Sequence, residues 1–327
     1  MRDFPTQIFS RTMPAILLGI FLTLTGCSDD GRASVYTPFD ELAFEDPVLT
    51  ACVLAQAKRH GWKKSGQMTR LVCTNAEGDA VQSLQGIENL VNLQVLDLAH
   101  NEISDIHLID HLERLTQLDL GYNQIKNAEL SRLRITLNWL NLDHNEIADV
   151  SWLANLRHLE TLSISHNRLR DIKPLAKLTD LKSLDLSHNE IASIAALGEL
   201  SGLHELDLSS NLITKISALE DARHLVILHL GNNQIASVDR LAGLSIIEEL
   251  DLANNRLTDV SPLAQVIALR RLNLSHNQIS DPTPLEGLGA IDALVIKGNP
   301  ISCDMVRKLV AVFGEGTVIA DACTGPA

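Results

Sequence analysis

The sequence predicts an α/β solenoid, in which short coils stack on one another and each coil adds one strand to a parallel sheet. Three observations support this prediction: a fixed repeat length, a column of asparagines and a recurring set of apolar positions. The asparagines stand 22 residues apart without a slip: Asn101, Asn123, Asn145, Asn167, Asn189, Asn211, Asn233, Asn255, Asn277 and Asn299. Self-similarity at such a period is typical of a repeat architecture.

Within one coil, the apolar positions divide into a strand and a tight helical stretch. Leu184 and Leu186 flank Asp185, an alternation that predicts a short strand with both leucines pointing inward. Upstream stand leucines at a spacing of three, which suits a 3-10 helix: Leu175, Leu178 and Leu181. One coil cannot bury these leucines alone, so stacked coils make a continuous core. The helical side is wider than the strand side, so we expect the sheet on the concave face.

The asparagine follows the strand, at a sharp turn where interior backbone groups cannot join a regular ladder. An amide side chain offers two donors and an acceptor. Stacked asparagines can therefore bond the backbone of their own coil and of the adjacent coil. We expect a structural role for all ten.

The repeat LxxLxxLxLxxNxIxDIxPL is matched by LANLRHLETLSISHNRLRDIKPL and by LAQVIALRRLNLSHNQISDPTPL. On these motifs the chain resembles the internalin-like class of leucine-rich repeat proteins, whose unit has 22 residues. The resemblance covers roughly residues 84–302, about ten units. It implies a horseshoe with a parallel concave sheet and short helical segments on the convex side. It also implies a scaffold for binding other proteins, without indicating which partner.

The two ends of a solenoid expose its core and need caps. We expect residues 46–83 to form an N-terminal cap and an irregular first coil, with Asp46 as the N-cap of a helix and Pro47 at its first position. Residues 303–327 form the predicted C-terminal cap, also helical. In one coil, Leu130 and Leu133 stand a residue off the regular positions, which predicts a bulge on the convex side.

Four cysteines stand near the caps: Cys52, Cys73, Cys303 and Cys323. Four cysteines allow three pairings, and proximity in the sequence favours the first with the second and the third with the fourth. The alternative is four buried thiols. Disulfides require an oxidising compartment, so the pairing depends on export.

The N-terminus is typical of an exported chain. Residues 1–26 read as a signal peptide with an apolar run, MPAILLGIFLTL, that is too short to span a bilayer as a mature helix. The run leads into Leu24-Thr25-Gly26-Cys27, which resembles the lipobox of bacterial lipoproteins. That resemblance implies lipidation of Cys27, with residues 27–45 as a tether; an ordinary secretory signal is the alternative. Ser28 after the cysteine points to the outer membrane rather than the inner membrane of the cell envelope.

Charge and motif content argue against several function classes. The formal charge of −14 opposes nucleic-acid binding, which needs clustered lysine and arginine. No phosphate loop, dinucleotide fingerprint or HExxH motif appears. We therefore expect a non-enzymatic scaffold without a cofactor, attached to the membrane by its lipid alone.

The outward strand positions are where a partner would bind, because the folding rule leaves them variable. We expect contacts from an acidic column and from two aromatic residues: Asp119, Asp185, Asp207, His229, Asp251, Trp139 and Tyr122. A tryptophan on the concave strand is typical of a binding anchor for a protein or peptide. Stacking of the same ring on a glycan of the cell wall is the alternative function. The structural alternatives are that aspartate suits the strand-to-turn position and that Trp139 packs over the irregular coil.

A histidine column stands immediately before the asparagines. His144, His166 and His188 fall in three consecutive coils, about 5 Å apart if stacked, and could chelate Zn²⁺ or respond to pH. No Cys or Glu recurs to complete a tetrahedral site, and other coils place Ser, Asn or Gly there. We therefore expect these histidines to lie on the rim of the concave face and predict no metal site.

Overall fold

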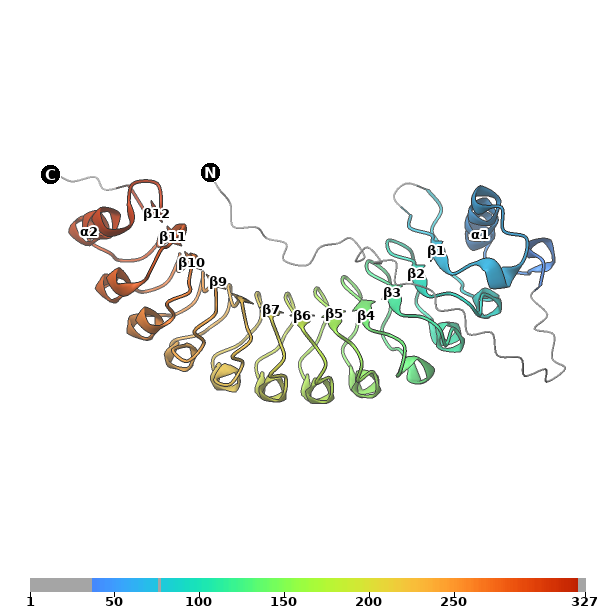
Figure 1. Ribbon diagram of the computed structural model, residues 1–327, viewed down its shortest axis with the longest axis horizontal. Coiled ribbons are helices and arrows are strands. Elements are labelled where there is room, and N and C mark those ends of the chain that lie inside the picture. The colour runs from blue at the N-terminus through green and yellow to red at the C-terminus, as the bar shows by residue number, and fades with distance from the viewer. Residues whose placement is uncertain (1–36, 76–77, 323–327) are drawn as a thin grey trace, which may run out of the picture.

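The computed structural model describes residues 37–75 and 78–322, which form one curved solenoid (Figure 1). Within these residues, twelve strands make a single sheet in which sequence neighbours pair in parallel. The strands are β1 (Arg70–Val72), β2 (Val95–Asp97), β3 (Gln117–Asp119), β4 (Trp139–Asn141), β5 (Thr161–Ser163), β6 (Ser183–Asp185), β7 (Glu205–Asp207), β8 (Ile227–His229), β9 (Glu249–Asp251), β10 (Arg271–Asn273), β11 (Ala293–Val295) and β12 (Val318–Ile319). The sheet lines the concave side and the helical turns lie along the convex side (Figure 1), so the predicted solenoid is confirmed.

The pairing register turns each column of the sequence into a column in space. Leu184 of β6 pairs with Leu206 of β7, and Asp185 pairs with Asp207. Neighbouring strands in a sheet lie about 4.8 Å apart. Residues that stand 22 apart in the repeats therefore lie side by side across the concave face.

Short 3-10 helices occupy the convex side of the repeats. They are Ile87–Asn89, His107–His111, Ser131–Leu133, Ser151–Asn155, Lys173–Lys177, Ala195–Glu199, Ser217–Leu219, Asp239–Leu241, Ser261–Gln265 and Thr283–Gly287. In the coil that contains Asn189, the apolar positions all face the core, at 2% exposure or less: Leu175, Leu178, Leu181, Leu184, Leu186, Ile191 and Ile194. The spacing of three thus marks a 3-10 turn whose leucines meet those of the coils on either side.

The predicted bulge concerns the coil around Leu130 and Leu133. Its 3-10 helix, Ser131–Leu133, has three residues, as in the later coils Ser217–Leu219 and Asp239–Leu241, and a turn follows it. Leu130 and Leu133 are nevertheless buried, and the displaced Ile135 is 71% exposed. The coil keeps its inward leucines by looping out the residues around them.

Each asparagine of the ladder connects two coils. Asn189 donates from Nδ2 to the carbonyls of Leu186 and Ser187 in its own coil, at 3.1 Å each, and to Ile164 of the preceding coil at 3.1 Å. Its Oδ1 accepts the N–H of Leu169, also in the preceding coil, at 3.0 Å. The other nine repeat this pattern, with Oδ1 accepting from the residue 20 positions earlier. The amide thus satisfies backbone groups that the turn would leave buried and unpaired.

The N-terminal cap is the helix α1 (Pro47–His60). Asp46 accepts hydrogen bonds from the N–H groups of Val48 and Leu49, so it is the N-cap as predicted. Its second oxygen accepts from the N–H groups of Gln82 and Ser83, at 2.7 and 3.2 Å. One carboxylate therefore begins the helix and joins it to the first coil, and these four hydrogen bonds hold the pKa of Asp46 below its usual value against the effect of burial.

The end of the expected tether packs on this cap. Residues 37–45 include a short 3-10 helix, Phe39–Glu41, in which Phe39 is 6% exposed. Leu42 and Phe44 pack against the core. Residues 37–45 are therefore part of the folded cap and not of an extended tether, because their apolar side chains cover the first coil. The expected signal peptide and Cys27 lie outside the described residues.

Cysteines secure the front cap. Cys52 of α1 and Cys73, which follows β1, form a disulfide with a Cα–Cα distance of 5.9 Å. The C-terminal cap consists of α2 (Cys303–Phe313), whose Leu309 is buried, followed by β12. Cys303 is disulfide-bonded, and Cys323, its expected partner, lies outside the described residues.

The asparagine ladder predicts a graded loss of stability. Replacing Asn189 by alanine leaves the buried Leu169 N–H without its partner, so we expect about 1–3 kcal/mol of destabilisation. The three carbonyls each keep one other hydrogen bond, from Asn167, Asn211 and the His166 N–H. Asn299 is the matched control, because it makes the same bonds in a half-buried position near the end of the stack. Asn299→Ala should cost less. Equal urea midpoints for wild type and Asn189→Ala would contradict this role.

Candidate functional site

Two columns of side chains face outward on the concave sheet. The leading column is the first residue of each repeat strand: Val95, Gln117, Trp139, Thr161, Ser183, Glu205, Ile227, Glu249, Arg271 and Ala293. The trailing column is the third residue: Asp97, Asp119, Asn141, Ser163, Asp185, Asp207, His229, Asp251, Asn273 and Val295. The intervening leucines are buried, as the alternation of a strand requires.

The trailing column is more buried than the sequence suggests. Asp119, Asp185 and His229 are 6%, 8% and 7% exposed. Five aspartates and two asparagines of this column accept the N–H of the residue two positions later, as in Asp185 to Ser187 at 2.8 Å. This local bond starts the turn after the strand. Part of the acidic column is thus explained by turn chemistry, although its carboxylates remain on the concave face.

Burial makes these carboxylates hard to ionise. It raises the pKa of Asp119 to about 6. Burial, together with the neighbouring carboxylates of Asp207 and Asp143, raises the pKa of Asp185 to about 8. Stacked like charges in a partly dry environment disfavour each other's charged form. The middle of the concave face therefore carries carboxylates whose ionisation a cationic partner would favour.

Between β7 and β10 two cations, His229 and Arg271, pair with carboxylates of the concave face. His229 lies 3.6 Å from Asp207 and 3.2 Å from Glu249, and Glu249 also pairs with Arg271. Burial alone would lower the pKa of His229, but its two carboxylate partners raise it to about 9. Burial would raise the pKa of Glu249, but His229 and Arg271 hold it below its usual value. Glu249 and Arg271 were not among the expected contacts, although their 22-residue separation places them side by side.

Trp139 and Tyr122, both expected to contact a partner, occupy different positions on the concave side. Trp139 is half-buried in the leading column, where it pairs in register with Gln117. Tyr122 lies five residues after Gln117, beyond the strand, and stacks between His100 and His144 with ring centroids 4.2 and 4.0 Å apart. The turn carries Tyr122 to the edge of the face, so Trp139 faces partners without it.

The histidine column is a stack of rings at a left-handed backbone position. Its non-glycine members have φ between 52° and 59°. Rings stack in five successive coils, His100, Tyr122, His144, His166 and His188, with centroids 3.9–4.2 Å apart. The sequence contained a signal for this backbone, because Asn232, Asn254 and Gly298 occupy the same column and these residue types favour it.

The stack is poorly arranged for chelation. His144, His166 and His188 lie in planes that differ by 10–12°. An imidazole nitrogen binds a metal along its own ring plane, so nearly parallel rings direct their lone pairs alongside each other rather than at one ion. Among residues 37–75 and 78–322, no group of three or more His, Cys, Asp or Glu side chains could hold a metal ion.

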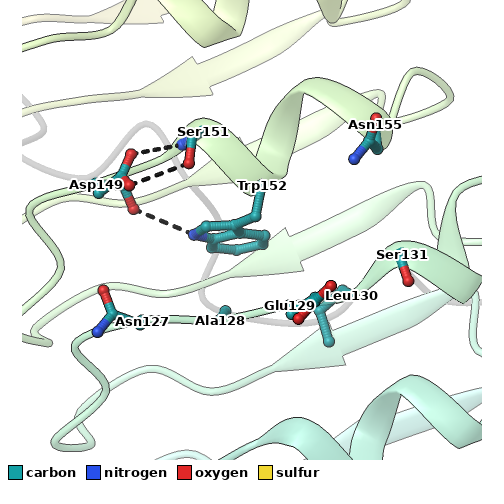
Figure 2. Close-up of a pocket in the computed structure, with 9 residues that line it drawn as sticks. All are labelled: Asn127, Ala128, Glu129, Leu130, Ser131, Asp149, Ser151, Trp152 and Asn155. Carbon is teal, nitrogen blue, oxygen red and sulfur yellow. Dashed lines mark hydrogen bonds between the residues drawn. The ribbon is translucent and has the colours of Figure 1, made fainter.

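The convex side has a hollow beside the irregular coil. Its volume is about 340 Å³, and it is lined by Asn127, Ala128, Glu129, Leu130, Ser131, Asp149, Ser151, Trp152 and Asn155 (Figure 2). Trp152 donates from its indole N–H to the Asp149 carbonyl at 3.2 Å. Ser151 donates from its backbone N–H and its hydroxyl to the Asp149 carboxylate. Of the polar groups drawn there, those of Asp149, Ser151 and Trp152 bond to one another.

Comparisons with known proteins agree with this architecture. A family model described as leucine rich repeats (2 copies) matches residues 91–132, 135–177, 157–201, 179–221, 201–243 and 247–287. A search of curated protein sequences gives no significant match.

Solved structures with the same fold include two internalins of Listeria monocytogenes. The internalin inlF is 28% identical, with a TM-score of 0.71 over 89% of this chain and 94% of that chain. Internalin C2 is 27% identical, with a TM-score of 0.56 over 73% of this chain and 97% of that one. A plant peptide hormone receptor, RGFR1 in complex with RGF2, shares the fold at 20% identity, with a TM-score of 0.56 over 72% of this chain and 45% of the receptor chain.

The raised pKa values predict that stability falls as pH rises. A carboxyl whose folded pKa is above its unfolded value stabilises the fold while it is protonated, and this contribution is lost between pH 4 and pH 8 for Asp185. His229 acts in the same direction, because its stabilising charge is lost as pH passes 9. Asparagine occupies the same column at Asn141 and makes the same turn bond. One pKa unit is about 1.4 kcal/mol, so we expect Asp185→Asn to stabilise the fold at pH 8 by about 1 kcal/mol or more.

The same substitution should stabilise the fold less at pH 5, because only the first part of the loss between pH 4 and pH 8 has occurred there. Asp259→Asn is the matched control, because this exposed aspartate has a lowered pKa from its bonds to Ser261 and should not gain stability on neutralisation. Thermal unfolding at both pH values measures the difference. A gain for Asp185→Asn that is equal at pH 5 and pH 8 would exclude the buried charge as its cause.

Proposed function

This chain belongs to the leucine-rich repeat family, and on that premise we propose that it is a non-enzymatic scaffold that binds a protein or peptide on its concave face. Its structural relatives support a scaffold role, and the receptor RGFR1 was solved in complex with RGF2. From β2 to β9, the leading and trailing columns hold seven carboxylates against one cation, His229, with Arg70 and Arg271 on the flanking strands β1 and β10. This one-sided charge is the observation that carries the proposal, because it suits a basic partner surface.

Shape supports the same face. The strands form an uninterrupted sheet along the concave side of the arc, from β1 to β12 (Figure 1). A curved surface of this kind can enclose a partner that a flat sheet would only touch. Trp139 is half-exposed in the leading column, and a large aromatic with two rotatable bonds supplies contact area at a low entropy cost. Shape, charge and the aromatic side chain of Trp139 therefore all favour binding on the concave face.

Site-specific photocrosslinking in cells tests this proposal. A crosslinking residue at Thr161 or Ser183 on the concave strands should capture a partner protein, and the control position Lys177 on the convex side should not. Trp139→Ala and Glu205→Lys should each reduce the captured amount several-fold, because they remove the anchor and reverse a half-buried charge. Capture from Lys177 alone would contradict the concave face. Capture of cell-wall polysaccharide in place of protein would establish glycan binding.

We also propose that the chain is anchored in a bacterial outer membrane through lipid on Cys27. The support is the lipobox-like sequence Leu24 to Cys27 after an apolar run, with Ser28 following. Among the described residues, no helix combines the length and apolarity that a membrane span needs. A single acyl chain binds membranes weakly and reversibly, so stable anchoring needs more than one chain.

Metabolic labelling with an alkyne fatty acid tests the anchor. The wild-type chain should be labelled and should fractionate with outer membranes. Cys27→Ser should abolish labelling and release the chain from that fraction, whereas Cys52→Ser, in the front disulfide, should leave labelling intact. Labelling that survives Cys27→Ser would place the lipid elsewhere.

A further inference from the structure

We propose that the concave face contains a subsite for one arginine side chain of the partner, formed by Trp139, Gln117 and Asp119. This inference rests on the proposed function, because it names the chemistry by which a peptide would be recognised there. The three side chains lie on two adjacent strands, β3 and β4, near the N-terminal end of the sheet (Figure 1).

The side-chain oxygen of Gln117 is a buried hydrogen-bond acceptor without a donor. Gln117 is 9% exposed, yet its Oε1 has no hydrogen-bond partner. Among the buried side-chain polar atoms of the described residues, this is true of one other, the hydroxyl of Thr136. A buried acceptor left unpaired costs about 1–3 kcal/mol. Because Oε1 is buried in the empty face, a ligand N–H would recover that cost once the amide turns toward it.

The carboxylate of Asp119 lies on the same strand as this amide. Gln117 and Asp119 project from the same face of β3, about 6.6 Å apart along the strand at 3.3 Å per residue. Oδ1 of Asp119 accepts from the Gly121 N–H at 3.0 Å and from Asn141 Nδ2 at 2.9 Å. Oδ2 receives no hydrogen bond from a described residue. The hydrogen bonds to Oδ1 thus fix the carboxylate, and Oδ2 keeps its acceptor capacity for a ligand.

The carboxylates of the concave face differ in whether they have a cation as a partner. Glu249 and Asp207, in the distal half, have His229 and Arg271 as partners. Among residues 37–75 and 78–322, no lysine, arginine or histidine lies within ion-pair distance of Asp119. Among the charged groups that act on it are two further carboxylates, Asp97 and Asp143. Arg70 and His100 act on Asp97 instead, so Asp119 itself lacks the paired cation that Glu249 and Asp207 have.

Arginine fits these three groups better than lysine does. Its planar guanidinium stacks on an indole ring and presents five donors in a fixed fork. Trp139 pairs in register with Gln117 on the next strand, about 4.8 Å away. A guanidinium lying on this indole could donate to Asp119 Oδ2 and to Gln117 Oε1 together, whereas a lysine ammonium would lose the planar stacking.

Peptide titration with the full-length chain tests the subsite. The probes are fluorescein-labelled heptapeptides of glycine and serine with arginine, lysine or citrulline at the centre; citrulline keeps the shape of arginine without its charge. At pH 8, where Asp119 is ionised, we expect the arginine peptide to bind at least tenfold more tightly than the citrulline peptide. Trp139→Ala and Asp119→Asn should each weaken the arginine peptide about tenfold and leave the citrulline peptide unchanged.

Gln117→Leu separates binding from folding. It removes the unpaired oxygen, so the variant should unfold at a higher temperature than wild type while it binds the arginine peptide more weakly. Asp259→Asn is the control: it neutralises an exposed aspartate outside the strand columns and should leave arginine binding unchanged.

Two results would overturn the subsite. One is equal binding of arginine and citrulline peptides, or no arginine-dependent binding at millimolar concentration. The other is a wild-type affinity in both Trp139→Ala and Asp119→Asn. Crosslinking of a protein from Thr161 or Ser183 in the same preparation would then leave the scaffold function standing without this subsite. Arginine binding without any crosslinked protein would instead leave the subsite standing and contradict the scaffold function.

Discussion

The rest of this structure depends on one constraint: the backbone at the turn after each strand must be satisfied inside the solenoid. A strand of three residues followed by a sharp turn leaves carbonyls and N–H groups that neither the sheet nor solvent can reach. An asparagine amide solves this by donating to its own coil and accepting from the coil before it. Because each amide joins two coils, the same bond sets the turn, the stacking distance and the register of the sheet.

The chemistry of the concave face follows partly from that solution. The left-handed residue before each asparagine has its side chain at the edge of the sheet, where the rings of five coils stack. The residue that ends each strand accepts an N–H of the turn, which favours aspartate or asparagine there. The acidity of the face is therefore in part a consequence of folding. Recognition has more scope in the leading column, where no turn bond restricts residue type and where Gln117 and Trp139 lie.

Much of the fold could be predicted from the sequence because the repeat states the same packing problem ten times. The leucine positions, the asparagine ladder and the N-cap at Asp46 all follow from local rules of spacing and hydrogen bonding. The burial of Asp119 and Asp185 did not, because alternation along a strand indicates direction but not how deeply a curved sheet covers its own face. The position of Tyr122 depended on a left-handed turn that shifts the ring away from Trp139. The unpaired oxygen of Gln117 could be found only with the packed neighbours in place.

The 22-residue register also has a consequence for how such a surface can vary. Because every coil presents the same donors and acceptors to the coil on either side, a whole coil can be duplicated or deleted without altering the caps. The binding face then varies by whole coils, and the length of the face changes in steps of one strand. A shift of any other size would break the amide bonds, so lineages that carry this scaffold should differ by entire coils and by substitutions in the leading column.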